Sequence, residues 1–94
     1  MVKNEHIKPI WQQKEYSSIV RTFQIEAVGG RGIKFIARMT NFGVSKDLFR
    51  IILLFSNPTT GSNISQETRE EFTMGQACIR CEEAHKIFME LTWP

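Results

Sequence analysis

The chain has 94 residues, of which 41% are hydrophobic and 23% are charged. A chain of this size is expected to fold as a single domain, 1–94, that is only marginally stable alone. Its 12 Lys and Arg against 10 Asp and Glu give a net charge of +2, far from the strongly basic balance of a dedicated duplex-DNA-binding domain. No apolar run approaches the ~20 residues of a membrane span, so we predict no membrane association.

Two features of the sequence favour a cytoplasmic protein. The first residues contain no apolar block of the kind found in secretory signals. The chain has two cysteines, Cys78 and Cys81, which are too few to cross-link a small secreted fold. We therefore expect reduced thiols in the cytoplasm.

The first half of the chain predicts an arm followed by a hairpin. Residues 1–14 are mostly polar, and we expect an extended arm that docks through Trp11, or a short edge strand. Apolar and polar residues alternate over 16–28 and again over 33–40, which predicts two strands. Three glycines within 29–32 suit a tight turn between them, so the two strands are expected to be antiparallel.

The third predicted strand, 48–55, is apolar on both parities apart from Arg50. Its length and its β-branched and aromatic content favour a strand over a helix. A strand that is apolar on both sides is expected to be covered on both faces of its sheet. We expect the C-terminal helix to cover one face and a second subunit to cover the other.

The following segment is predicted to be a long loop. Residues 57–66 are polar and contain Pro58 and Gly61, which is typical of a loop. Residues 67–73 fit either a fourth strand or the start of one long helix. We favour the strand, because Gly75 costs about 1 kcal/mol inside a helix.

A helix is predicted at the end of the chain, where Thr73 and Gln76 form a capping box that places its start near Met74. One face of this helix has apolar spacing of three and four and consists of Ala77, Cys81, Ala84, Phe88 and Leu91. The fold class is therefore α+β. We predict an antiparallel three- to four-stranded sheet within 15–74, in β-β-β-β-α order, with the helix 75–92 packed on one face.

The sequence offers little chemistry, and we predict a non-enzymatic protein with no cofactor and no metal site. Cys78, Cys81 and His85 have a spacing that suits part of a zinc site, but zinc needs a fourth ligand and the nearest candidate is the distant His6. In the alternative reading, the cysteines are small buried hydrophobes and His85 is a half-exposed helical residue. A redox role is disfavoured, since Cys78 lies more than one turn inside the predicted helix.

The face of the sheet opposite the helix is the predicted functional surface. Its apolar residues form the predicted protein interface, which consists of Leu48, Ile52, Leu54 and Ile36. The apolar face of the helix is the alternative interface. An apolar centre with an Arg and Thr rim is typical of protein–protein interfaces. We predict a small binding or regulatory protein that acts as a homodimer and contacts an unidentified protein partner.

An alternative function uses the basic residues of the same surface. These are Arg31 at the turn and Lys34, Arg38 and Arg50 on the strands. Such a surface suits single-stranded DNA or RNA, although binding sites of this kind generally also have aromatic side chains for base stacking. Strand parity places no aromatic residue on this face.

Overall fold

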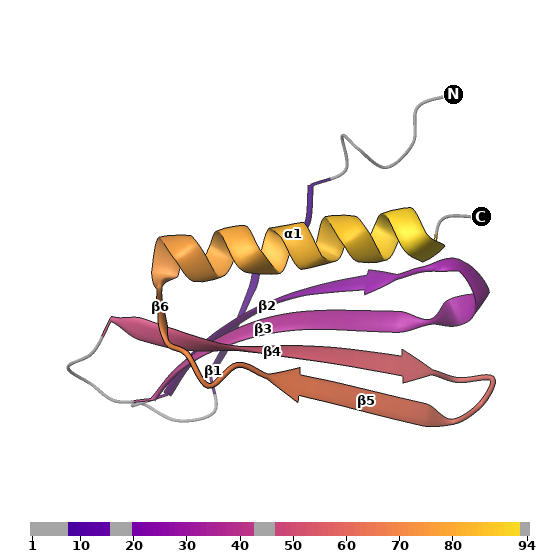
Figure 1. Cartoon of the computed structure of the whole chain (residues 1–94), viewed down its shortest axis with the longest axis horizontal. Helices are drawn as coiled ribbons and strands as arrows, with labels where there is room; N and C mark the ends of the chain where they lie inside the picture. The colour runs from indigo at the N-terminus through magenta and orange to yellow at the C-terminus, as the bar shows by residue number, and fades with distance from the viewer. Residues whose placement is uncertain (1–7, 16–19, 43–46, 93–94) are drawn as a thin grey trace.

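The computed structural model describes residues 8–15, 20–42 and 47–92, and it confirms the α+β class and the antiparallel sheet with one C-terminal helix (Figure 1). Its elements are β1 (Gln12–Glu15), β2 (Val20–Val28), the 3-10 turn η2 (Gly30–Gly32), β3 (Lys34–Phe42), β4 (Leu48–Asn57), β5 (Ser62–Glu67), β6 (Phe72–Thr73) and α1 (Met74–Thr92). The predicted strands correspond to β2, β3 and β4. Part of the first predicted strand, 16–19, lies outside the described residues.

The sheet has more strands than predicted. Its order is β1-β2-β3-β4-β5, with every pair antiparallel, and β6 pairs with the first two residues of β4. The N-terminal segment, predicted as a docking arm or a short edge strand, contributes the edge strand β1. It also docks on the helix, because the Trp11 indole Nε1 donates a hydrogen bond to Glu82 Oε2 at 2.8 Å.

The prediction of a ten-residue loop over 57–66 is wrong. Only residues 58–61 form a turn, and 62–67 return as β5, which pairs with β4 from Ile52 to Asn57. Every residue of β5 is exposed. An edge strand needs only backbone hydrogen bonds to one neighbour, so a sequence that is polar apart from Ile64 can form one without the apolar alternation that sequence analysis detects.

The register divides the sheet into two faces. Odd-numbered residues of β2, β3 and β4 face α1, and even-numbered residues face away from it. The covered face supplies most of the core, including the fully buried Ile25, Phe35 and Ala37. Phe35 stacks on Phe88 of α1 with ring centroids 4.9 Å apart and an interplanar angle of 16°.

The predicted helix start is confirmed. The backbone N–H of Thr73 donates to Gln76 Oε1, and the backbone N–H of Gln76 donates to Thr73 Oγ1, both at 3.3 Å. This is the reciprocal pattern of a capping box. Phe72, just before the cap, is buried and faces the core as expected for a short entering strand.

The predicted apolar face of the helix needs two corrections. Leu91 is 80% exposed rather than buried, and His85 is 5% exposed rather than half-exposed. From Phe88 the buried face continues by four residues to Thr92 instead of by three to Leu91. Thr92 can approach the sheet because Gly29 lies directly below it, where a Cβ atom would be only 2.6 Å from the Thr92 Cβ.

Candidate interaction surface on the open face of the sheet

The face of the sheet opposite α1 is not covered by any element of the described residues (Figure 1). At its centre lie Ile36, Ile52 and Leu54, which we call the apolar trio. Ile36 is directly opposite Leu54 across β3 and β4, and Ile52 is two residues from Leu54 on the same side of β4. All three are half-buried, so neighbouring side chains shield them at the sides while their outer surface faces solvent.

The structure brings together three of the four residues predicted for the protein interface. Leu48 has the same strand parity as the trio, but it pairs with Thr73 of β6 and is separated from Ile52 by Arg50. Its carbonyl oxygen accepts a hydrogen bond from Asn41 Nδ2 at 2.9 Å. Leu48 therefore lies at the margin of the surface and not at its centre.

The predicted basic residues do not form one continuous patch. Arg38 is directly opposite Ile52 of the trio, Arg50 lies two residues from Ile52 along β4, and Lys34 lies beyond the other end of the trio, opposite Ser56. Arg31 is in the η2 turn at the end of the hairpin, where it has a positive φ of 66°. The cations therefore surround an apolar centre instead of forming a single groove.

Arg38 is held by a hydrogen bond on the open face, whereas Arg50 has only a distant acidic neighbour. Arg38 Nε donates to Gln24 Oε1 at 3.0 Å, and Arg50 Nη1 lies 4.0 Å from Glu67 Oε1. Gln24 is 4% exposed, so it is a buried group that orients the Arg38 guanidinium. Sequence analysis did not assign a role to Gln24, because that role depends on the cross-strand register that places it opposite Arg38.

The open face also contains a buried polar pair. Thr22 and Thr40 are directly opposite one another in β2 and β3, and their hydroxyl oxygens are 3.3 Å apart. They are 1% and 5% exposed. Cross-strand Thr pairs contribute to sheet stability, and their burial shows that this part of the even-numbered face, unlike the trio, is closed to solvent.

Aromatic side chains are on the other side of the sheet. Phe23, Phe35, Phe49 and Phe55 all have the odd parity of the covered face, and Phe35 and Phe55 contact Phe88 of α1. Among the residues of β2, β3 and β4 whose side chains the structure describes, the open face therefore offers no ring on which a base could stack; Phe42, at the far end of β3, has the even parity of this face.

The cysteines and His85 are part of the covered core. Cys78 is half-buried, and Cys81 is completely buried beneath α1. Burial, with smaller contributions from Cys78 and Glu82, raises the pKa of the Cys81 thiol to about 12. Burial and then Glu82 raise the pKa of Cys78, so both sulfurs are held as thiols, the less reactive form.

Burial shifts the pKa of His85 in the opposite direction. Its pKa is lowered by burial, an effect that Glu82 partly opposes, and its ring lies 6.4 Å from the Phe35 ring. Within the described part of the chain, no group of three or more His, Cys, Asp or Glu side chains is arranged to hold a metal ion. His6, the fourth ligand considered above, lies outside the described residues.

The comparisons with known proteins add no assignment to this surface. No helix in the described residues is both long and apolar enough to cross a membrane. No model of a protein family matches the chain, and neither a curated protein nor a solved structure is significantly similar to it.

Proposed function

We propose that this protein is a small non-enzymatic interaction module that dimerises by packing the open face of its sheet against the open face of a second copy. The observation that carries the proposal is the apolar trio, three aliphatic side chains at the centre of a sheet face that no described element covers. An antiparallel sheet with one bare face usually presents polar side chains to water on that face. The apolar centre therefore favours a partner.

The dimensions of the open face suit such a contact. Five strands spaced about 4.8 Å apart span roughly 20 Å, and six residues along a strand span roughly 20 Å. A face of this size can supply much of the roughly 800 Å² that each partner buries in a standard interface. Two sheets that pack face to face bury their inner side chains in the same way as a β-sandwich.

The charges around the trio also suit a second copy. Arg38 and Arg50 share the open face with Glu26 and Glu67, so the rim carries both signs. A surface that contains both signs can be complementary to itself when two copies are related by a two-fold axis. A strongly negative partner would place like charges opposite Glu26 and Glu67.

Single-stranded nucleic acid is the second candidate occupant. It is favoured by the cations on the open face, where Lys14, Lys34, Arg38 and Arg50 outnumber the two acids. No aromatic residue adjoins the apolar trio in the strand register, which places single-stranded nucleic acid below a protein partner, since base stacking supplies much of the affinity in such sites. This alternative predicts salt-dependent binding of an oligonucleotide that Arg38→Ala weakens.

Sedimentation equilibrium with a matched pair of variants tests the homodimer. We expect the wild-type protein to be a dimer at micromolar concentration and Leu54→Glu to be a folded monomer. Ile79→Glu makes the same type of change on the outer surface of α1, where Ile79 is 58% exposed, and it should remain dimeric. A monomeric wild-type protein, or a Leu54→Glu variant that dimerises as tightly as the wild type, would contradict the proposal.

A further inference from the structure

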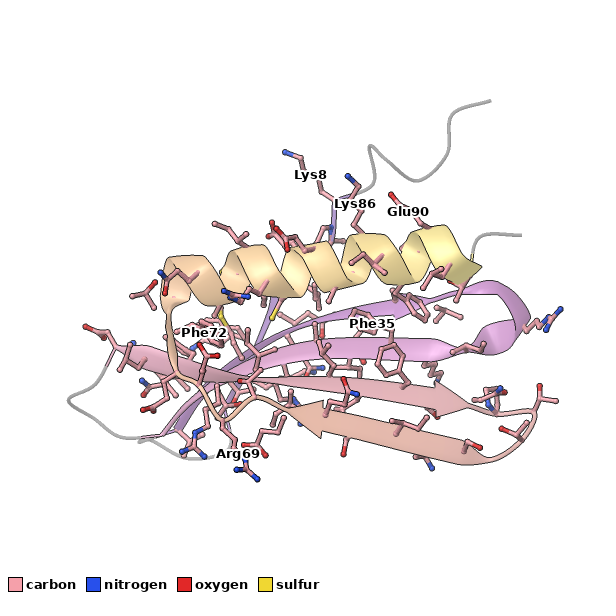
Figure 2. All side chains as sticks on the ribbon, viewed as in Figure 1. Lys8, Phe35, Arg69, Phe72, Lys86 and Glu90 are labelled. Carbon is pink, nitrogen blue, oxygen red and sulfur yellow. The ribbon has the colours of Figure 1, made fainter. Side chains whose placement is uncertain are left out.

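A second surface feature lies at one end of the open face, where two arginines line the same depression. The depression has a volume of about 430 Å³ and is lined by Arg50, Glu67, Thr68 and Arg69. Arg50 comes from β4, and the other three residues come from the end of β5 and the bend that follows it. Figure 2 shows Arg69 on the side of the sheet opposite α1, with its side chain directed away from the molecule.

The backbone that carries these arginines is fixed by Thr68. The N–H of Thr68 donates to the Ile51 carbonyl at 2.9 Å, and the N–H of Ile51 donates to Thr68 Oγ1 at 3.0 Å. The Thr68 hydroxyl in turn donates to the Glu70 carbonyl at 3.1 Å. These bonds continue the ladder of β4 past the end of β5, so the residues next to Ile51 and Thr68, which are Arg50 and Arg69, are held on neighbouring segments.

The positive charge of this arrangement is only partly compensated. Like charges on neighbouring strand segments are unfavourable. Arg50 has one acidic neighbour, Glu67, at the long distance of 4.0 Å, and both side chains are about half exposed, at 46% and 51%. A solvent-exposed ion pair of this kind contributes little. Within the described residues Arg69 has no ion pair.

We propose that this depression binds a phosphate group between the guanidinium groups of Arg50 and Arg69. Each guanidinium presents several N–H donors in a planar fork that suits oxyanions. A phosphate has more acceptor oxygens than a carboxylate and can be shared by two forks. Glu67 competes with the ligand for Arg50, so it limits the affinity of the site. Arg50 and Glu67 also belong to the rim of the proposed dimer interface, whereas Arg69 lies on the bend beyond it, so phosphate binding is measured on a monomeric variant as well as on the wild type.

An NMR titration of the full chain with inorganic phosphate at low ionic strength tests the site. We expect the amide resonances of residues 67–71 and the Nε–H resonances of the two arginines to shift with a common Kd. Arg69→Gln and Arg50→Gln should each weaken that Kd roughly three- to tenfold. Glu67→Gln should tighten it, because it releases Arg50, and this gain cannot result from a loss of folding.

Arg31→Gln is the matched control, because it removes the same charge from the exposed turn at the end of the β2–β3 hairpin. It should leave the Kd unchanged. An equal loss for Arg31→Gln and Arg69→Gln would show that phosphate responds only to net charge, and it would overturn the proposal. So would the lack of any shift at residues 67–71 on addition of phosphate.

Two further arms of the titration distinguish the source of the phosphate and separate this site from the dimer. A nucleoside monophosphate and a short single-stranded oligonucleotide replace inorganic phosphate. Tighter binding of either, with the same dependence on Arg69, identifies the ligand as a monoester or as a phosphodiester backbone. The monomeric Leu54→Glu variant should bind phosphate at least as tightly as the wild type, because Arg50 and Glu67 no longer face a second copy, so failure of the dimer and failure of this site give different results.

Discussion

The two faces of the sheet are built from the same three strands, yet only one of them packs against α1. On the covered face, odd-numbered residues pack against α1, and Ile25, Phe35 and Ala37 have no exposed surface. On the open face, the even-numbered trio is only half-buried. The comparison shows that, between Phe35 and Phe55 in β3 and β4, strand parity separates the side chains that pack against the helix from those that remain for a partner.

The largest expected difference between the faces comes from adjacent residues of β3. Phe35→Ala removes a fully buried ring that stacks on Phe88, and it should lower the free energy of unfolding by about 3–5 kcal/mol. Ile36→Ala on the open face should cost only about 1–2 kcal/mol. Denaturant unfolding at a concentration where both variants are monomeric measures the two losses. Equal losses would remove the distinction between the faces.

A smaller effect is expected where the covered face closes against the end of the helix. Gly29→Ala would place a Cβ 2.6 Å from Thr92 Cβ and 2.9 Å from Phe88 Cζ, which should cost about 1–3 kcal/mol through overpacking. Gly75→Ala is the control, because no atom lies within 4 Å of its added Cβ. It should stabilise the helix by about 0.5–1 kcal/mol. Thermal unfolding of both variants gives the sign of each change, and a neutral Gly29→Ala would show that the helix end does not pack closely.

The covered face should also make the protein sensitive to alkaline pH through Cys81. Burial raises the pKa of this thiol from 9.0 to about 12, so between those values the folded state binds more protons than the unfolded state. The stabilising contribution is complete below pH 9.0 and is lost as the pH rises toward 12, by at most about 1.4 kcal/mol per pH unit.

Unfolding experiments on either side of the thiol's ordinary pKa test this dependence. Cys81→Ala should remove most of the alkaline slope, whereas Cys78→Ala should retain it, since Cys78 is only half-buried. A slope that is the same in the wild type and in Cys81→Ala would show that the buried thiol does not control alkaline stability.

The smallest effect is expected at the start of the helix that creates the covered face. Thr73→Ala removes the hydroxyl that accepts the Gln76 N–H and should cost about 1 kcal/mol. Thr73→Ser keeps the hydroxyl and should lie close to the wild type. Circular dichroism during thermal unfolding checks both variants, and a Thr73→Ser variant as unstable as Thr73→Ala would exclude the cap as the cause.

Much of the covered face could be predicted from the sequence, because apolar alternation over β2 and β3 and the Thr73–Gln76 capping box are local signals. The strand β5 could not be predicted, since an exposed polar edge strand has no hydrophobic pattern. The prediction that Leu91 is buried was wrong. Spacings of three and four residues both fit a helix face, and the close approach at Gly29 places Thr92, not Leu91, against the sheet. On the open face, parity predicted which residues share the surface. It did not reveal that Gln24 orients Arg38 or that Thr68 brings Arg69 beside Arg50, because both depend on register.

The central claim is that the open face is occupied by the open face of a second copy. An isotope-filtered NOE experiment on a mixture of differently labelled protein tests it most directly, because only contacts between copies give signals. The account predicts intermolecular NOEs among the methyl groups of Ile36, Ile52 and Leu54. Intermolecular NOEs confined to the outer surface of α1, or no intermolecular NOE at these methyl groups, would contradict it.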